Sequence, residues 1–562
     1  MPSSTAATAL RQLLRCANEF GQGCGTPKYA LLRTLEKQAL PKAVDVVRLH
    51  DTLCFLRAYP DDAVTLRQVE RMMTVFSARN DVKKYRRALV DTGIAGTQIN
   101  FRFFAATAHW LARRWGQHLT IDWEEFEHRD QLELWLTSMT LYCETPGLDA
   151  YAFDVHEWIE RLKGPGETDA RFLLRRFERM PMKPRASEIL LEDLDVPLCL
   201  HPGPNTPART REKYAGVPIV YQTRPLSRIR PSVQEIIERK PAVRALSTRE
   251  GHKIVDLARA AMATRSRDLD AFAYASKHDV QLIDCADGLH IALIGLSPER
   301  RLFLETLYGF LVLKNGVPVG YGTLTGLFNS AEIAYTIFDN FRSGEAAAMV
   351  GWVLTVASRF LEADTIVVDP YQIGQDNEDA IRSGAWWFYQ KLGFRPRKRA
   401  ALQVMRKELK RMQVNPSHRS SVRTLTKLAE HNMFLNLNGL RDDVLGILPL
   451  ADVGLRVSEY LASRFGSKRE AAVDTCRAEA LELLNVRSYR RFSPAERLAW
   501  SWWAPLVMCI PNIARWRNID KRALAALIRA KAGRSEMTYL RRFNTHKRLR
   551  NALQQLATHG AR

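Results

Sequence analysis

The sequence predicts an α+β protein in which a central mixed sheet with flanking helices lies between two all-α regions. At 562 residues the chain is too long for a single hydrophobic core, so several domains are expected. Toward both ends, apolar residues recur at the three- and four-residue spacing of helices, whereas the middle holds short apolar runs typical of strands. We expect a helical region at 1–163, a Pro-rich connecting region at 164–239, the sheet domain at 240–412 and a basic helical region at 413–562.

Composition and charge restrict the class of protein. With 46% hydrophobic and 26% charged residues, the chain can bury enough apolar surface to fold. The net charge of +22 is concentrated at one end, because residues 395–562 hold 34 Lys and Arg against 13 Asp and Glu, whereas residues 1–394 hold 49 against 48. None of the eight cysteines forms a C-x-x-C pair, which argues against a zinc ribbon or a disulfide framework and favours reduced thiols.

The sequence contains no evident targeting or membrane segment. Its first residues, MPSSTAATALRQLLRC, lack the apolar core of a secretory signal. The most apolar stretch, at 499–510, is interrupted by Pro505 and is shorter than the ~20 residues that a bilayer requires. We therefore expect a cytoplasmic protein without a transmembrane segment.

The expected elements follow one another along the chain. LRQLLRCANEF and QLELWLTSMTLY have helical spacing, and the proline-rich stretch 181–207 reads as a connection. A helix at 253–263 precedes the strands HDVQLID and LHIALIG and a hairpin that turns at Asn315-Gly316. AEIAYTIF is a strand, EAAAMVGWVLTVASRFLEA a helix and TIVVDP a buried strand. After Pro416 the pattern is helical to the end, with a capped helix start at Ser493.

The segment SGAWWFYQKLGFRP, at 383–396, is the most distinctive motif. Gly393 can adopt the left-handed conformation that ends a helix, and Phe394 then returns to the core. The aromatic run before Tyr389 would pack this helix onto a sheet. One interpretation is a core helix that delivers Tyr389 to a site, and the alternative is a buried helix with no site.

The order hairpin, strand, glycine-bearing turn, helix, strand, helix and Gly-Phe resembles the GNAT superfamily of acyl-CoA N-acyltransferases over 251–410. Members commonly end their second conserved helix with Tyr-Glu-Lys-x-Gly-Phe, and this chain has YQKLGF at 389–394. The resemblance implies that Tyr389 is the general acid that protonates the departing thiolate. It also implies acetyl-CoA or another acyl-CoA as co-substrate and an amine acceptor. The thirteen histidines show no H-E-x-x-H and no pairing with cysteine, so no metal is expected.

In the superfamily, a turn that reads Arg/Gln-x-x-Gly-x-Gly/Ala holds the pyrophosphate of coenzyme A with its backbone N–H groups and the following helix N-terminus. Here Gly344 and Ala346 match, but Phe341 stands where Arg or Gln is expected. Glu345 adds a carboxylate, which is unfavourable beside a pyrophosphate unless it turns away; alternatively it is only an acid at a helix start. The residues expected to hold the cofactor are Ile337, Phe338, Arg342, Ser343, Gly344, Glu345 and Ala346.

Acyl transfer also requires a base, and Glu332 is the candidate. By strand alternation it shares a face with Ala334, Thr336 and Phe338. The alternative is an exposed residue at a strand edge. Superfamily members often carry an Asn seven residues before the Tyr, but here Asn377 lies twelve residues before Tyr389, which puts the usual contact of this amide with the cofactor in doubt. The acidic loop at 369–379 could receive a cationic amine or a metal, or it could simply be solvated.

Two functions are therefore carried forward. The first is transfer of an acyl group from acyl-CoA to an amine. The second is a catalytically inactive fold of this kind that serves as a binding protein. In that case the basic segment 515–562, with 13 Lys and Arg against two acids, contacts nucleic acid or an acidic partner. Trp516, Tyr539 and Phe543 are interspersed in that segment, which could equally be a solvated helical face.

Overall fold

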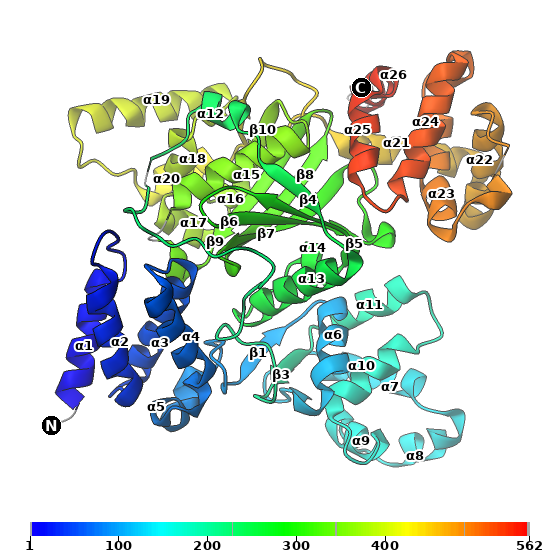
Figure 1. Ribbon diagram of the computed structural model, residues 1–562. Helices are drawn as coiled ribbons and strands as arrows, with labels where there is room; N and C mark the ends of the chain where they lie inside the picture. The colour runs from blue at the N-terminus through cyan, green and yellow to red at the C-terminus, as the bar shows by residue number, and fades with distance from the viewer. Residues whose placement is uncertain (1–2, 228, 343–344, 488, 559–562) are drawn as a thin grey trace.

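A computed structural model describes residues 3–227, 229–342, 345–487 and 489–558, and Figure 1 shows a central sheet with helical regions around it. Two helical groups lie below the sheet in that view, and the C-terminal helices lie at its upper right. The first group comprises α1 (Ser3–Cys16), α2 (Gly25–Lys37), α3 (Ala43–Ala58), α4 (Ala63–Thr74) and α5 (Asn80–Lys84). The second comprises α6 (Ala105–Trp115), α7 (Arg129–Met139), α8 (Thr145–Ala150), α9 (Val155–Leu162), α10 (Asp169–Glu178) and α11 (Pro184–Asp193).

The central sheet has nine strands in the order β11-β12-β10-β9-β8-β7-β6-β5-β4. Among the described strands, β9 and β10 are the only parallel neighbours, and every other adjacent pair is antiparallel. The sheet is therefore mixed, as expected from the sequence. Its strands are β4 (Ala242–Ala245), β5 (Ala275–Asp284), β6 (Leu289–Leu296), β7 (Thr306–Lys314), β8 (Val317–Leu327), β9 (Ser330–Ile337), β10 (Thr365–Val368), β11 (Arg395–Pro396) and β12 (Met433–Asn436).

The helices of the central region connect or cover these strands. The hairpin between β7 and β8 turns at Asn315 and Gly316, which have φ of 50° and 79°, as a two-residue hairpin turn of type I′ requires. The central helices are α12 (Val233–Glu238), α13 (Thr248–Ala263), α14 (Asp270–Ala273), α15 (Ala346–Phe360), α16 (Pro370–Ile373), α17 (Glu378–Ser383), α18 (Ala385–Lys391), α19 (Arg399–Val414) and α20 (Val422–Ala429).

The C-terminal region is helical from α21 onward. The predicted helix start at Ser493 is confirmed, because its side chain accepts a hydrogen bond from the Glu496 backbone in a capping box. The longest described helices have 16 residues, and no helix in the described part of the chain is long and apolar enough to cross a membrane. These C-terminal helices are α21 (Leu450–Phe465), α22 (Arg469–Leu483), α23 (Pro494–Cys509), α24 (Asn518–Lys531), α25 (Met537–Thr545) and α26 (Lys547–Thr558).

Three parts of the structure differ from the sequence expectation. The region 413–562, expected to be helical throughout, contributes β12, which pairs with both β10 and β11 of the central sheet. The region 1–163, also expected to be helical, contains β1 (Ile99–Arg102) and β2 (Leu119–Ile121). Both pair with β3 (Pro197–Leu200) from the stretch expected to be a connection, which also contains α10, α11 and α12. These strands are short and pair over long sequence distances, so local alternation does not reveal them.

A buried ionic network attaches the C-terminal helices to the sheet. The Asp279 carboxylate of β5 accepts hydrogen bonds from the Tyr308 hydroxyl of β7 and from the backbone N–H of Glu536, both at 2.9 Å. The Lys531 ammonium forms an ion pair with the Glu536 carboxylate, and both side chains are completely buried. Lys531 also donates to the Glu305 carbonyl at 2.7 Å. Each buried charge therefore has a partner, which burial of charge requires.

This network predicts a large effect for Lys531→Met. The substitution leaves the Glu536 carboxylate buried without its cation, so we expect a loss of about 3–5 kcal/mol in the free energy of unfolding. Denaturant unfolding followed through the fluorescence of buried Trp500 and Trp503 measures it. The matched control is Arg529→Met on the same helix, which removes a half-exposed ion pair with Glu496 and should cost about 1 kcal/mol or less. Equal losses in both variants would contradict the role of the network.

Candidate functional site

The site is organised by the point at which β9 and β10 part. The two strands pair only at Thr365↔Ser330, Ile366↔Ala331 and Val367↔Glu332. Beyond Glu332, β9 continues to Ile337, whereas β10 ends and its chain turns into α16. On the edge away from β8, the later part of β9 therefore faces α16 rather than a strand, and the sheet opens there.

The side chain of Gln372 occupies this opening. Its amide Nε2 donates to the Tyr335 carbonyl of β9 at 2.8 Å, in the place where a strand would otherwise bond. Gln372 is held by the start of α16, since its backbone N–H donates to the capping carboxylate of Asp369 at 2.9 Å. The Gln372 amide thus takes the hydrogen-bonding position that a neighbouring strand would occupy. A side chain is more easily displaced from such a position than a strand.

Tyr389 reaches this opening from α18. The helix ends as predicted: Gly393 has φ of 106°, and Phe394 is fully buried and lies 5.4 Å from the Tyr389 ring. Tyr389 is itself only 2% exposed. Burial raises the pKa of its hydroxyl well above the usual value, while a hydrogen-bonding interaction with Gln372 acts to lower it. The phenol is therefore protonated at neutral pH, as a proton donor must be.

Glu332 lies in the interior of the sheet, between β8 and β10, so the alternative of an exposed residue at a strand edge is wrong. Its side chain is half-buried and makes no hydrogen bond or ion pair with any described residue. Burial and the nearby carboxylates of Asp369 and Glu305 raise its pKa from 4.5 to about 7. A carboxylate without a partner and with such a pKa can accept a proton near neutrality.

Glu332 and Tyr389 approach the opening from opposite faces of the sheet. Tyr389 belongs to the hydrophobic core that contains Ile366 and Val368, whereas Val367, the register partner of Glu332, belongs to the core beneath the C-terminal helices. Asp369 is within electrostatic reach of both residues, because it raises the pKa of each. The two predicted catalytic residues are thus brought to one junction without direct contact.

A second buried phenol lies near Tyr389. The Tyr335 ring points into the same core, and its hydroxyl has no hydrogen-bond partner among the described residues. Tyr389 is one of the groups that raise the Tyr335 pKa, after burial and Tyr59. An unpaired buried hydroxyl is costly, and a ligand in the opening would supply the missing partner. Sequence reasoning missed both Tyr335 and Gln372.

The turn after β9 is partly enclosed by neighbouring regions. Phe341 is completely buried and stacks on Phe55 of α3 at a ring distance of 6.4 Å. Phe338 is also buried, beneath the Arg265 guanidinium at 3.8 Å. Phe341, which stands where the superfamily has Arg or Gln, thus serves as a packing residue for the N-terminal helices. Ser343 and Gly344 lie outside the described residues.

The accessible part of the turn carries charge. Arg342 is exposed and forms an ion pair with Asp339 at 2.8 Å. Glu345 stands at the N-cap position of α15, and its carboxylate forms an ion pair with the buried ammonium of Lys314 at 3.1 Å. The negative charge that the sequence placed beside the turn is therefore neutralised from β7. Ile337 and Ala346 are half-buried at the two ends of the turn.

The acidic loop and the potential metal ligands have structural roles. Asn377 caps α17 by accepting from the Ala380 backbone at 3.1 Å, and its amide donates to the Tyr371 carbonyl. One group of potential metal ligands occurs in the described part of the chain, namely His156, Glu160 and Asp169. The Asp169 carboxylate accepts from the Trp123 indole and from two backbone N–H groups, so its oxygens are already engaged.

The chain matches no family model, and comparison with curated proteins and with solved structures found no match.

The raised pKa of Glu332 predicts a pH-dependent effect of Glu332→Gln. Because the folded pKa of about 7 lies above the ordinary 4.5, ionisation of Glu332 favours the unfolded chain as pH rises. The wild-type protein should therefore lose stability relative to the variant between pH 4.5 and about 7, and the difference should level off above that. The free energies of unfolding of the wild type and of Glu332→Gln, measured across this pH range, give this difference in stability. A difference independent of pH would show that Glu332 ionises normally.

Proposed function

We propose that the protein transfers an acyl group from an acyl-CoA to an amine at the opening between β9 and β10. The observation that carries this proposal is the arrangement of Glu332 and Tyr389 on opposite faces of the opening, next to the amino end of α15. It also rests on the resemblance of 251–410 to acyl-CoA N-acyltransferases.

The chemistry assigns one proton transfer to each residue. Glu332, with a pKa of about 7, accepts a proton from the ammonium of the acceptor, directly or through water. The free amine attacks the thioester carbonyl, the new C–N bond forms and the C–S bond breaks. Tyr389 gives its proton to the departing thiolate. The Tyr389 phenolate then takes the remaining extra proton from the new amide nitrogen, so the products are a neutral amide, CoA with a free thiol and protonated Glu332, which releases its proton to solvent.

The cofactor is assigned to the same opening. In the proposal, the pantetheine arm takes the place of the Gln372 amide beside the Tyr335 carbonyl, as the superfamily resemblance implies for strands that part. The pyrophosphate then lies at the amino end of α15, where the helix dipole and exposed Arg342 favour an anion. Ile337 and Phe338, at and just after the end of β9, and Ala346, at the start of α15, are the described residues assigned to the cofactor. Lys314 keeps the Glu345 carboxylate from repelling the phosphates.

A second candidate is an inactive fold of this kind that binds a partner. Two observations favour it: Tyr389 is buried, and Phe341 is fixed beneath α3 rather than free to serve as a phosphate ligand. With eight free cysteines, we place either form of the protein in the cytoplasm.

Ligand-induced stabilisation distinguishes the two candidates. A ligand at 100 times its dissociation constant stabilises the folded protein by about 2.7 kcal/mol, so acetyl-CoA or a longer acyl-CoA should raise the melting temperature. Pantetheine alone tests the opening between β9 and β10, and ADP alone tests the proposed pyrophosphate site at the amino end of α15. An unchanged melting temperature at millimolar concentrations of every acyl-CoA would favour the inactive fold.

Tyr389→Phe tests the general acid. The substitution removes one hydroxyl, so turnover should fall by roughly 10²–10⁴-fold with little change in KM. Release of free thiol from acetyl-CoA, with a panel of amines, measures turnover. The matched control is Tyr274→Phe, which removes a hydroxyl bonded to Glu192 of α11, away from β9 and β10, and should leave turnover nearly unchanged. A stable Tyr389→Phe protein with wild-type turnover would remove Tyr389 from the mechanism.

A further inference from the structure

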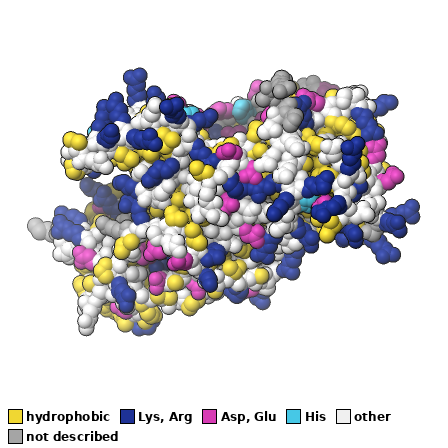
Figure 2. All heavy atoms as spheres, turned by 90° about the horizontal axis from the view of Figure 1, so that it is seen from above, with side chains coloured by type: hydrophobic (Ala, Val, Ile, Leu, Met, Phe, Trp, Pro, Cys, Tyr) yellow, Lys and Arg dark blue, Asp and Glu magenta, His cyan; other side chains and the backbone are white. Residues whose placement is uncertain are grey.

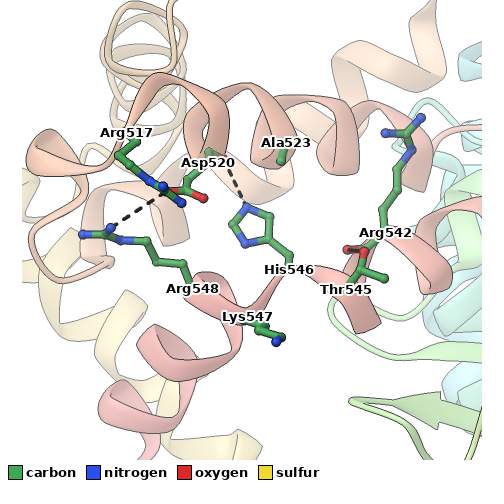
Figure 3. A pocket seen from close by; sticks show the side chains of 8 residues that line it. All are labelled: Arg517, Asp520, Ala523, Arg542, Thr545, His546, Lys547 and Arg548. Atoms are coloured by element: carbon green, nitrogen blue, oxygen red, sulfur yellow. Dashed lines mark hydrogen bonds and ion pairs between the residues drawn. The ribbon is translucent and has the colours of Figure 1, made fainter.

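A basic pocket lies among the last three helices, far along the chain from the opening between β9 and β10. Figure 3 shows its lining, and its volume is about 400 Å³. Four cationic side chains from α25, α26 and the residue before α24 surround it: Arg517, Arg542, Lys547 and Arg548. A single carboxylate, that of Asp520, lies among them.

The imidazole in this pocket is fixed and adds no charge. His546 Nδ1 accepts from the Leu549 backbone N–H at 3.1 Å, so the proton is on Nε2, which donates to the Asp520 carbonyl at 3.1 Å. Burial lowers the pKa of His546, which keeps the ring neutral. The ring ties the start of α26 to the first turn of α24, and the shape of the pocket depends on this link.

The cations outnumber the acid that could neutralise them. Asp520 is shared by Arg517 at 3.2 Å and Arg548 at 3.8 Å, and both turn toward it in Figure 3. Arg542 and Lys547 extend away from it and have no acidic partner in the part of the chain that the structure describes. Gathering four cations around one carboxylate leaves a strong positive potential, which an anion would relieve.

The aromatic residues of the segment exclude one mode of recognition. Trp516 is 5% exposed, and Tyr539 and Phe543 are completely buried in the C-terminal core. None of the three can stack on a base. A ligand would therefore be held through its charge alone, without the base contacts that give sequence specificity.

We propose that the cations of this pocket bind neighbouring backbone phosphates of a nucleic acid, without regard to base sequence. A polyanion fits better than a single small phosphate, because exposed cations continue beyond the pocket, among them Arg515, Arg522 and Arg541. Figure 2 shows Lys and Arg side chains spread over the whole face that it views, so net charge alone does not locate a site. The four cations gathered around this pocket do locate one. The site is independent of the acyl-transfer proposal.

The test measures binding of the full-length protein to a labelled DNA duplex of about 20 base pairs between about 50 and 200 mM salt. Each phosphate contact contributes a slope of about −0.9 to log K against log salt. The double variant Arg542→Gln/Lys547→Gln removes two contacts and should make the slope shallower by about 1.8. Over a fourfold rise in salt, its affinity should then fall roughly 12-fold less than that of the wild type.

The matched control is Arg406→Gln/Lys407→Gln, which removes one exposed Arg and one exposed Lys from α19, neither with an acidic partner among the described residues. The control should keep the wild-type slope. Melting temperatures confirm that both variants are folded. The proposal is wrong if the wild type does not bind the duplex at about 50 mM salt, if both double variants change the slope equally, or if inorganic phosphate binds while the duplex does not.

Discussion

The central structure depends on the parallel pairing of β9 with β10. Parallel neighbours cannot be joined by a tight turn, so the chain crosses over the sheet through α15. This crossover places the amino end of α15 directly after β9 and starts β10 beside the start of β9. Because β10 has four residues and β9 has eight, the pairing ends at Glu332 and the rest of β9 is left beside α16. The opening results from this difference in strand length, and it lies where the amino end of α15 and the two candidate catalytic residues come together.

The flanking regions pack against the central sheet on two sides. On one side, Phe341 is fixed by Phe55, so the N-terminal helices pack against the turn after β9. On the other side, the network of Asp279, Lys531 and Glu536 holds the C-terminal helices against the sheet. The domain that holds the central sheet is thus flanked by helices from both ends of the chain.

Local signals predicted the centre of the fold well. The hairpin at Asn315 and Gly316 and the helix stop at Gly393 are confirmed because each depends on a few adjacent residues with special backbone preferences. The strand β12 was missed because four residues carry little periodicity and are held by long-range pairing with β10. The three-stranded sheet of β1, β2 and β3 was missed for the same reason.

The candidate site was predicted only in part. The sequence indicated Tyr389 and Glu332 through motif and alternation, but not that they face opposite sides of the sheet. It gave no sign that Gln372 occupies the opening, since that role requires the end of β10 to be known. Burial of Trp516, Tyr539 and Phe543 likewise depends on how α23 to α26 pack, which spacing in one segment does not reveal.

Hydrogen–deuterium exchange with saturating acetyl-CoA tests most directly whether the opening between β9 and β10 is the cofactor site. Bound pantetheine would cover the edge of β9 that β10 leaves unpaired, and bound pyrophosphate would cover the first turn of α15. Exchange should therefore slow at 333–337 and 345–350 and stay unchanged in the C-terminal helices. Unchanged exchange in both segments, or protection only elsewhere, would contradict an acyl-CoA site at this junction.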